Sequence, residues 1–511
     1  MSKHKRKGRV KFIKSGNAFI EDIEKDESFF VHRKYLNNIL PYDIVEYKIG
    51  YHYDKMEVTY VNLFKRTKTN YVVNITTNKK GSCVMNFVDK SMQYIPVVDS
   101  PIEELIKYNN KKVKVEILDI INTDFHSEAK VLIKIVDVIG DISDNNSEIE
   151  SILIDNEIDI SFDKRVLNEV KHIPTEITKK EINRRRDMRN VCTFTIDPHN
   201  SKDFDDALSV KILNDNNYQI GIHIADVSHY VKMGSELEQE AFKRGNSVYL
   251  VDRVIPMLPH KLSNEICSLN PNEDRLAYSL VLTFNENFEI IDKWLGKTII
   301  HSDKRFTYEE ANDILHLEED VKFKKQLTLL YNISKFLRNK RMKSALDFKR
   351  SEVSFKLDDK GNPIGLKVKK SIPTNHLIEE FMLLANRTVG DILKENKTGV
   401  FRIHESPNME RMEEISSLTS LFGIKFNLYN NADKMKKEIN RFLNSVKESS
   451  HNDLFNTLMI KAQSKAKYST ENLGHYGLGK GFENYTHFTS PIRRYSDYIV
   501  HIILSESLNY K

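Results

Sequence analysis

The sequence is organised around Thr195–Ala207, which reads TIDPHNSKDFDDA and places four aspartates within ten residues. These aspartates are Asp197, Asp203, Asp205 and Asp206. Residues 191–196 alternate between apolar and polar side chains, which predicts a half-buried β-strand that ends at Asp197. Pro198 has no backbone N–H and favours a turn, and a second apolar run begins at Ala207. The carboxylates are therefore expected on a turn between two strands.

Four carboxylates this close repel each other strongly, so a fold keeps them only when their charge is neutralised. Their hard oxygen atoms suit magnesium or manganese, and two such ions can activate water and stabilise a leaving oxygen at a phosphodiester. An EF-hand calcium loop would need Gly at its sixth position and Glu at its twelfth, and both are missing. A solvated acidic turn is the plain alternative, but Phe204 inside the cluster indicates a loop that packs inward.

The pattern Asp-x5-Asp-x-Asp-Asp resembles the catalytic signature of the RNB family, the ribonuclease II and ribonuclease R exoribonucleases. Further stretches that resemble RNB sequences follow in order: Arg244–Leu250, Ile255–Pro259, Leu262–Pro271, Ala345–Phe348, Leu377–Asn386, Phe401–His404, Gly474–Leu478 and His487–Asp497. The resemblance covers nearly the whole chain. It implies a multidomain fold, in which two N-terminal OB or cold-shock-like β-barrels precede a large α/β RNB catalytic domain.

The length of 511 residues predicts about three or four domains, at ~150 residues for each. We expect a cold-shock-like OB domain at residues 1–66, a second OB-like domain at 67–140, a linker and helical segment at 141–190, and the RNB domain at 191–511. The runs expected to form the barrel strands are Gly8–Phe12, Gly16–Ile20, Ser28–His32, Leu36–Asp43, Tyr71–Val73, Ser82–Met85, Gln93–Val98, Lys112–Ile117 and Lys130–Val136. The family usually continues into an S1 RNA-binding domain, and none is expected in this sequence, which stops at Lys511.

Phe19, Phe30 and His32 are the candidate RNA contacts of the first barrel. OB barrels stack bases on aromatic side chains that lie on strands beside basic residues, although for either phenylalanine taken alone a core position is the favoured interpretation. The strand order resembles a cold-shock domain, with Phe30 and His32 on its second RNA-binding strand. Asn17 stands where that family usually carries an aromatic residue on the first one.

The motif His487–Asp497 predicts a helix that begins with Ser490 as its N-cap. The apolar face of this helix is expected at Ile492, Tyr495, Ile499 and Ile502. Arg493 and Arg494 then fall in the first turn, where the helix dipole disfavours cations. They are either a surface pair tied to Asp497 or donors that converge on a phosphate, and we favour the phosphate because the motif also matches the family.

The resemblance implies a cytoplasmic, processive 3′-to-5′ exoribonuclease that hydrolyses single-stranded RNA to nucleoside 5′-monophosphates. Magnesium is the expected cofactor, with manganese as the alternative. Asp197, Asp203 and Asp206 are the expected metal ligands, while Asp205 serves a second ion or positions the attacking water. Arg493 is expected to steady the scissile phosphate.

The resemblance also implies RNA contacts beyond the carboxylates. Tyr249 and Phe348 would stack on the 3′-terminal bases, Glu379 would contact the terminal ribose, and Arg494 would bind RNA. Without the family, an aromatic residue would read as core and a glutamate as a solvated helix face. His223 and His229 lie on or after a strand expected at residues 218–227, and we interpret both as structural rather than as metal ligands.

Composition bears on compartment and partners. No run approaches the ~18 apolar residues of a membrane span, and the basic residues 1–9 precede no apolar stretch of a secretory signal. Cys83, Cys192 and Cys267 form neither a CxxC pair nor a zinc spacing, which fits a reducing compartment. The net charge of +5 permits nucleic-acid binding without requiring it. We expect single-stranded RNA as partner, RNA-decay factors or ribosomes as further candidates, no membrane, and a monomer.

Two rival functions stay open. A non-catalytic RNA-binding protein that retains the RNB fold should have lost one or more of the four aspartates, and all four are present. An endonuclease with the same metal chemistry is compatible with the sequence, because specificity for a chain end comes from the shape of the channel.

Overall fold

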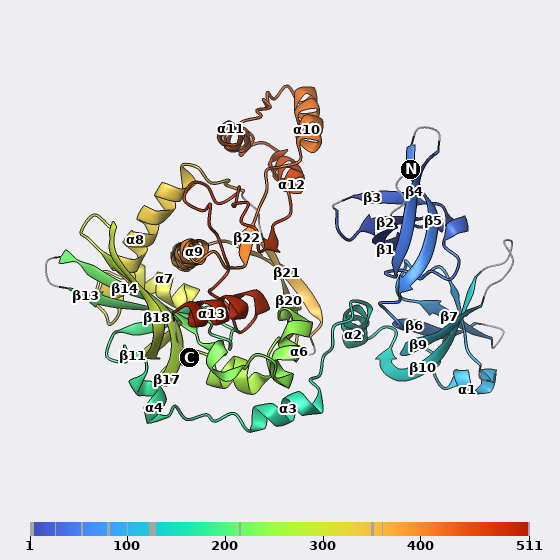
Figure 1. The fold of residues 1–511 in the computed structure, drawn as a ribbon, viewed down its shortest axis with the longest axis horizontal. Helices are drawn as coiled ribbons and strands as arrows, with labels where there is room; N and C mark the ends of the chain where they lie inside the picture. Colours follow the sequence, from blue (N-terminus) through green and yellow to red (C-terminus); the bar gives the residue numbers. More distant parts are fainter. Residues whose placement is uncertain are drawn as a thin grey trace. The chain divides into compact units, whose positions relative to one another are not determined.

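The computed structural model describes residues 5–25, 27–52, 55–78, 82–99, 101–121, 129–213, 216–348, 352–359 and 361–508. The chain forms two compact units (Figure 1). The first comprises Met1–Ser161 with Leu357–Asn362, and the second comprises Phe162–Lys356 with Pro363–Lys511. The predicted order, in which a strand-rich N-terminal part precedes a large α/β domain, is confirmed.

The first sheet of unit one has the strand order β3-β2-β1-β4-β5, with antiparallel neighbours. Its elements are β1 (Arg6–Phe12), β2 (Ala18–Asp22), β3 (Ser28–Val31), η1 (Arg33–Tyr35), β4 (Ile44–His52) and β5 (Lys55–Lys65). The strand expected at Leu36–Asp43 is wrong, because this stretch forms turns. Asp43 Oδ2 accepts a hydrogen bond from Leu40 N at 2.8 Å, and Asn38 and Tyr42 have positive φ angles. The strands missed there are β4 and β5, which follow immediately.

The second sheet of unit one has the order β7-β6-β9-β10-β8, in which β8 runs parallel to β10. Its elements are β6 (Asn70–Thr77), β7 (Cys83–Phe87), β8 (Ile95–Val97), α1 (Ile102–Ile106), β9 (Lys111–Ile121) and β10 (Lys130–Asp141). The linker and helical segment expected at residues 141–190 begins with helix α2 (Asn145–Asp155). Asp144 caps this helix by accepting a hydrogen bond from Ser147 N at 2.9 Å. An acidic polar segment is therefore ordered here by its own N-cap.

Unit two is built on a seven-stranded mixed sheet with the order β11-β18-β17-β14-β13-β12-β19. Its strands are β11 (Arg186–Asp187), β12 (Thr193–Asp197), β13 (Asp206–Ile212), β14 (Tyr218–Ala225), β17 (Asp274–Phe284), β18 (Ile290–His301) and β19 (Lys304–Thr307). Strand β12 pairs antiparallel with β13 and parallel with β19. The prediction that β12 is half-buried is wrong, because all five of its residues are buried. A central strand with covered faces buries its threonines together with its apolar residues.

Helices cover both faces of this sheet (Figure 1). On one face, α7 (Tyr308–His316), α8 (Lys324–Met342) and α9 (Pro373–Glu395) form a core with alternate residues of β13, β14 and β17. On the other face, α3 (Lys164–Lys171), α5 (Val227–Tyr230) and α6 (Glu236–Arg244) pack against the remaining residues of the same strands, which point to the opposite side of the sheet. Helix α13 (Tyr495–Ser507) contributes to both cores.

The remaining elements of unit two surround this framework. They are α4 (Lys179–Asn183), β15 (Val248–Tyr249), β16 (Val254–Ile255), the π-helical turn η3 (Lys261–Ile266), β20 (Glu352–Leu357), β21 (Pro363–Lys369), β22 (Phe401–Ile403), α10 (Met409–Leu421), α11 (Ala432–Ser445), α12 (Asn452–Ala462) and β23 (Lys467–Ser469). Helices α10–α12 form a group with a core of their own (Figure 1). Within the described residues, no helix is both long enough and apolar enough to cross a membrane.

Candidate active site

A cavity of about 470 Å³ opens where β12 ends and β13 begins. Antiparallel pairing of Thr193 with Ser209 and of Phe194 with Leu208 brings these two strand ends together. The cavity is lined by Asp197, Asp203, Asp205 and Asp206, by Tyr249 and Tyr308, by residues of α9, and by the segment that precedes α13. The predicted turn that carries four carboxylates is therefore present, and it faces a cavity that is open to solvent.

The turn is held by hydrogen bonds to a distant loop. Phe204 N donates to Ser268 Oγ at 3.0 Å, and the Ser268 hydroxyl donates to Lys202 O at 2.8 Å. Leu269 N donates to Phe204 O at 3.0 Å, and the Phe204 side chain is 7% exposed. The prediction that Phe204 packs inward is confirmed. Its burial anchors the carboxylates on either side of it.

The partners of the four carboxylates differ. Asp203 accepts hydrogen bonds from Ser201 Oγ at 3.2 Å and from Tyr249 OH at 2.9 Å. Asp205 accepts one from Ile492 N at 2.9 Å through Oδ1, and its Oδ2 lies 3.3 Å from Arg493 Nε. Asp197 Oδ2 is buried and receives no hydrogen bond from any described residue. Among the residues that the structure describes, Arg493 is the one cation that forms an ion pair with a carboxylate of this cluster.

This shortage of positive charge shifts the titration of the carboxyl groups. Burial raises the pKa of Asp205 to about 8 in spite of Arg493. Burial, with the neighbouring negative charges added to it, raises the pKa of Asp197 and of Asp206 to about 7. A carboxyl group with a raised pKa lacks stabilisation of its charged form. The site is therefore electrostatically prepared for an additional cation.

The donor set fits a divalent metal ion. All four candidate ligands are carboxylates, which magnesium and manganese prefer, and the buried Asp197 Oδ2 has an unused lone pair. Within the described residues, no three His, Cys, Asp or Glu side chains converge closely enough to complete a ligand set by themselves. Magnesium usually keeps several waters and takes further oxygens from phosphate, so few protein ligands suffice. Which carboxylates coordinate stays a prediction.

Arg493 and Arg494 both line the cavity, but their side chains are held differently. Arg493 pairs with Asp205, and its Nη2 donates to Ser490 Oγ at 3.0 Å. Arg494 pairs with the buried Asp497, with Nη2 2.7 Å from Oδ1. The first alternative, a pair tied to Asp497, therefore holds for Arg494. Arg493 is the arginine in contact with the carboxylate cluster.

The helix expected to start after Ser490 begins at Tyr495 instead, so that prediction is wrong at its N-terminus. Ser490 N donates to Asp497 Oδ1 at 2.9 Å, which folds the preceding chain back over the first turn of α13. The Arg493 carbonyl accepts from Ser247 N at 3.0 Å, and Tyr495 N donates to Gly245 O at 2.8 Å. These bonds tie the segment to residues 245–247 and keep it in turns before the helix. The two arginines consequently precede the helix instead of lying in its first turn.

Of the predicted RNA contacts in unit two, the structure brings Tyr249 and Glu379 to the cavity together with Arg494. Tyr249 lies on β15 with 51% of its surface exposed. Phe348 is not among the lining residues and packs against the core of α10–α12. His223 is fully buried between Ser209 and Ser279 hydroxyls, 2.8 Å and 2.6 Å from its ring nitrogens, in agreement with a structural role.

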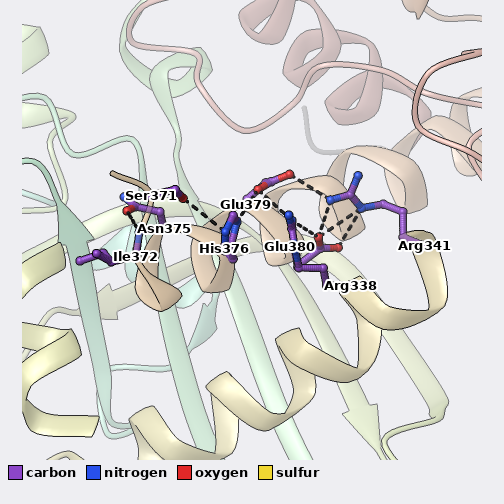
Figure 2. Close-up of polar contacts among 8 residues, drawn as sticks. All are labelled: Arg338, Arg341, Ser371, Ile372, Asn375, His376, Glu379 and Glu380. Carbon is purple, nitrogen blue, oxygen red and sulfur yellow. Dashed lines mark hydrogen bonds and ion pairs between the residues drawn. The ribbon is translucent and has the colours of Figure 1, made fainter. Parts of the chain in front are cut away.

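Glu379 on α9 has partners from two helices, drawn in Figure 2. Its Oε1 lies 3.0 Å from Arg341 Nη2, and its Oε2 lies 3.3 Å from Arg338 Nη1. His376 Nδ1, one turn earlier on α9, is 3.2 Å from the same Oε2. Figure 2 also shows Glu380, the neighbouring residue of α9, in contact with both arginines. The carboxylate at the cavity wall is thus held by cations on α8.

The candidate RNA contacts of unit one lie on β2, on β3 and directly after β3. Phe19 and Phe30 are directly opposite each other, with ring centroids 5.8 Å apart in an edge arrangement, and Phe19 is 38% exposed. His32 is exposed and caps η1 by accepting from Lys34 N at 3.3 Å. Exposed aromatic edges of this kind are compatible with base stacking. Their role stays a prediction.

Tyr308 is a cavity residue that the sequence reasoning missed. It is the first residue of α7, directly after β19, whose last residue, Thr307, is paired with Asp197. The parallel pairing of β12 with β19 carries Tyr308 to the carboxylates. Near Tyr308, the capping box of Thr307 and Glu310 indicates where a helix begins. Nothing in the local sequence indicates that β12 pairs with β19.

The comparisons with known proteins agree with this site. The model of the RNB domain matches residues 185–510, which is more than half of the chain. The chain is 35% identical over 438 residues to Ribonuclease R 1 of Lactococcus lactis, covering 84% of this chain and 53% of that protein. It therefore spans about half the length of that curated relative.

Two further comparisons differ in what they imply. The structure resembles that of Mycoplasma genitalium RNase R, solved in complex with ribose-methylated single-stranded RNA, with a TM-score of 0.88 and 26% identity over 98% of this chain and 79% of that one. The chain is also 35% identical over 403 residues to the Arabidopsis thaliana protein named Inactive exonuclease DIS3L2, covering 73% of this chain and 38% of that protein. The match to the domain model, the aspartate cluster and the cavity around it together place this chain in the RNB family.

Proposed function

We propose that this chain is a processive 3′-to-5′ exoribonuclease that hydrolyses single-stranded RNA to nucleoside 5′-monophosphates. The observation that carries the proposal is the cavity lined by four aspartates, in which Arg493 pairs with Asp205. A protein that keeps all four aspartates at such a site keeps the groups that metal-assisted phosphodiester hydrolysis needs. Direction, product and processivity rest on the resemblance to the ribonuclease R relatives.

The proposed cofactor is magnesium, with manganese as the alternative. Asp197, Asp203 and Asp206 would hold it, and the hydrogen bond from Tyr249 to Asp203 keeps one of these carboxylates oriented toward the cavity. When bound, a divalent cation supplies positive charge to the phosphate and lowers the pKa of a water ligand. The unsatisfied Asp197 Oδ2 supports this assignment.

Asp205 and Arg493 would act on the reacting groups. Both oxygens of Asp205 are held, one by Ile492 N and the other by Arg493, so the carboxylate has a defined position. We assign it to orienting the attacking water or to a second cation. Arg493, 43% exposed, donates only part of its guanidinium to Asp205 and Ser490 and would stabilise the charge of the scissile phosphate.

The RNA contacts of the proposal lie around the same cavity. Tyr249 would stack on a base at the 3′ end, Glu379 would accept a hydrogen bond from the terminal ribose, and Arg494 would add positive charge. The stacking role of Phe348 stays a prediction that the cavity lining does not support. The Mycoplasma genitalium protein was solved with single-stranded RNA, and this supports the same class of ligand here.

The test is digestion of a single-stranded RNA labelled at its 5′ end, in magnesium with and without excess chelator. We expect the label to shorten from the 3′ end, mononucleotides to accumulate, and the reaction to stop in chelator. A circular RNA of the same sequence is the control, because an exonuclease leaves it intact. Cleavage of the circle would favour the rival endonuclease, and absence of any cleavage would contradict the proposal.

A second candidate is a non-catalytic RNA-binding protein with the RNB fold. It is favoured by one observation, the 35% identity to a relative that is named inactive. Such a protein would retain labelled RNA in a filter-binding assay without shortening it in magnesium or manganese. The four aspartates favour the enzyme, because a protein that only binds RNA gains nothing from carboxylates beside a phosphate.

The setting of the activity is part of the proposal. Cys83, Cys192 and Cys267 are all free thiols, which supports a reducing compartment such as the cytoplasm. RNA-decay factors or ribosomes as partners, and a monomeric state, stay predictions from the sequence.

A further inference from the structure

Glu379 is held by a cluster of charged residues that do not line the cavity and that the proposed reaction does not use. The cluster consists of Arg338 and Arg341 on α8 and of His376 and Glu380 on α9. Figure 2 shows both arginines reaching from α8 toward the two glutamates. Of the two glutamates, only Glu379 lines the cavity, with 43% of its side chain exposed.

Arg341 is the centre of this cluster. Its Nη2 lies 3.0 Å from Glu379 Oε1 and 2.6 Å from Glu380 Oε1, and its Nε donates to Glu380 at 3.1 Å and 3.2 Å. Arg341 is 9% exposed and Glu380 is 3% exposed. The bond to the buried Glu380 orients the guanidinium, and the oriented guanidinium holds the carboxylate of Glu379.

A buried ion pair is a weak source of stability, because desolvation of both charges offsets their attraction. A well-packed apolar pair could join α8 to α9 at a comparable free energy. What an apolar pair could not provide is a donor directed at a carboxylate on the cavity wall. The geometry therefore indicates that Arg341 serves the position of Glu379 more than the stability of the fold.

The cluster also removes an electrostatic difficulty. A lone carboxylate on the wall of a site that takes RNA would repel the phosphates. Here two guanidinium groups balance the two carboxylates of Glu379 and Glu380. A carboxylate balanced in this way can accept hydrogen bonds from sugar hydroxyls without adding net negative charge to the cavity.

We propose that Arg341 is a positioning residue that sets the preference for ribose over deoxyribose at the 3′-terminal nucleotide, by holding the Glu379 carboxylate where it accepts from the sugar hydroxyls. Arg338, which is 28% exposed and lies 3.3 Å from Glu379 Oε2, has the same role to a smaller extent. The inference rests on the proposed function, since it needs RNA hydrolysis and a ribose contact of Glu379. A terminal ribose offers two adjacent hydroxyl donors, and a 2′-deoxyribose offers one.

The test compares two oligonucleotides that differ only in the 2′-hydroxyl of the last nucleotide. The readout is the ratio of kcat/KM for removal of that nucleotide from the ribo and the 2′-deoxy substrate. In Arg341→Met we expect the rate on the ribo substrate to fall about tenfold, as for one lost hydrogen bond to a charged group, with little change on the deoxy substrate. Arg341→Lys, which keeps the charge but not the fork, should restore part of the ratio.

The matched control is Arg441→Met on α11. Arg441 also pairs with a buried glutamate, Glu438, at 2.6 Å, but neither residue lines the cavity. The control should leave the ratio of the two rates unchanged. A double variant of Arg341→Met with Glu379→Gln should discriminate no worse than Glu379→Gln alone, because Arg341 acts through that carboxylate.

An equal loss on both substrates would show that Arg341 only tethers α8 to α9, and it would overturn the inference. A parent protein that removes both nucleotides at the same rate would also overturn it, while leaving the proposed function intact. A parent that hydrolyses neither RNA in magnesium would remove the proposed function and this inference together. If Arg341→Met does not fold, Arg338→Met decides the question: a smaller drop of the same ratio supports the inference, and an unchanged ratio contradicts it.

Discussion

Asp197 and Asp226 occupy comparable places and have opposite environments. Each stands at the end of a strand of the central sheet, Asp197 as the last residue of β12 and Asp226 directly after β14, and both are buried. Asp226 Oδ2 lies 2.7 Å from Arg185 Nη2 and 3.4 Å from Lys297 Nζ. Asp197 forms no ion pair with any residue that the structure describes.

The pKa values of the two groups follow from this difference. Burial alone would favour the neutral acid in both, but Arg185 and Lys297 hold the pKa of Asp226 below its usual range. Burial raises the pKa of Asp197 to about 7, and Asp205 and Asp203 add to it. A buried carboxylate that the fold itself neutralises supports the structure. One that the fold leaves uncompensated marks a place where an external cation fits.

The largest expected effect comes from metal removal. In excess chelator the hydrolysis of RNA should fall to background, and magnesium or manganese should restore it, because among the described residues only Arg493 forms an ion pair with one of the four aspartates of the cavity. The measurement is the initial rate on a labelled single-stranded RNA across a metal titration. Undiminished activity in metal-free buffer would contradict the conclusion that Asp197, unlike Asp226, needs an external cation.

The next effect is expected for Asp205→Asn. The change keeps the shape of the side chain and removes one negative charge, so turnover should fall by on the order of 10³ while RNA affinity stays the same or rises slightly. Turnover and equilibrium binding are measured on the same RNA. Asp313→Asn, on the exposed face of α7, is the control and should be as active as the parent. Loss of binding in folded Asp205→Asn would assign this carboxylate to the RNA site instead of the reaction.

The third prediction is that asparagine at position 226 and asparagine at position 197 change the free energy of unfolding in opposite directions. Asp226→Asn removes the carboxylate that pairs with Lys297 and one of the two that pair with the buried Arg185, which keeps Glu181, and should lower the free energy of unfolding by about 3 kcal/mol. Asp197→Asn removes a buried charge that forms no ion pair with a described residue, and should raise the free energy of unfolding by about 1 kcal/mol at pH 7.5 without metal. Denaturant unfolding in chelated buffer measures both. Shifts of the same sign would show that the two environments do not differ as described.

The smallest expected effect is a pH dependence of the free energy of unfolding that comes from His223, on the strand that ends directly before Asp226. Burial lowers the pKa of His223 on β14 to about 3, whereas an unfolded histidine titrates near 6.5. Below pH 6.5 the unfolded chain binds a proton that folded His223 does not, so stability falls as the pH decreases from 6.5 toward 3, by about 1.4 kcal/mol per pH unit. Asp226, with its pKa lowered, loses stabilisation only below about pH 4, from its unfolded value.

This pH dependence is measured by unfolding at several pH values between 7 and 5. His223→Gln retains a neutral polar side chain between Ser209 and Ser279 and should reduce the slope. An equal slope in parent and variant would assign the dependence to other groups. Asp226 does not contribute to the slope between pH 7 and 5, because it loses stabilisation only below about pH 4. The effect of His223 is therefore measured separately from that of Asp226.

Several features of this chain could be predicted because their signals are local. The turn that carries the aspartates follows from a strand pattern, a proline and a second apolar run, and the structure has β12, the turn and β13 in that order. The five strands expected in residues 67–140 are present as β6 to β10. Short alternating runs separated by turn residues specify strands without knowledge of what they pair with.

Two errors, at β12 and at Ser490–Arg494, occurred where neighbours distant in sequence determine the local structure. Strand β12 is fully buried because β19, about 110 residues later, pairs with it. The segment Ser490–Arg494 is not helical because its backbone bonds to residues 245–247 and Asp497 bonds to Ser490 N. No periodicity in the sequence reports such contacts.

The sequence alone determined the chemistry of the site. It supplied four carboxylates on one turn, an arginine motif and the resemblance to the RNB family, because residue types and their spacing are local properties. Only the tertiary structure decided which of these groups meet. It brought Arg493 to Asp205, left Asp197 without an ion pair among the described residues, turned Phe348 toward the α10–α12 core, and placed Arg341 in contact with Glu379. These relations depend on strand pairing and helix packing between residues that lie tens to hundreds of positions apart, and that distance is why the sequence could not specify them.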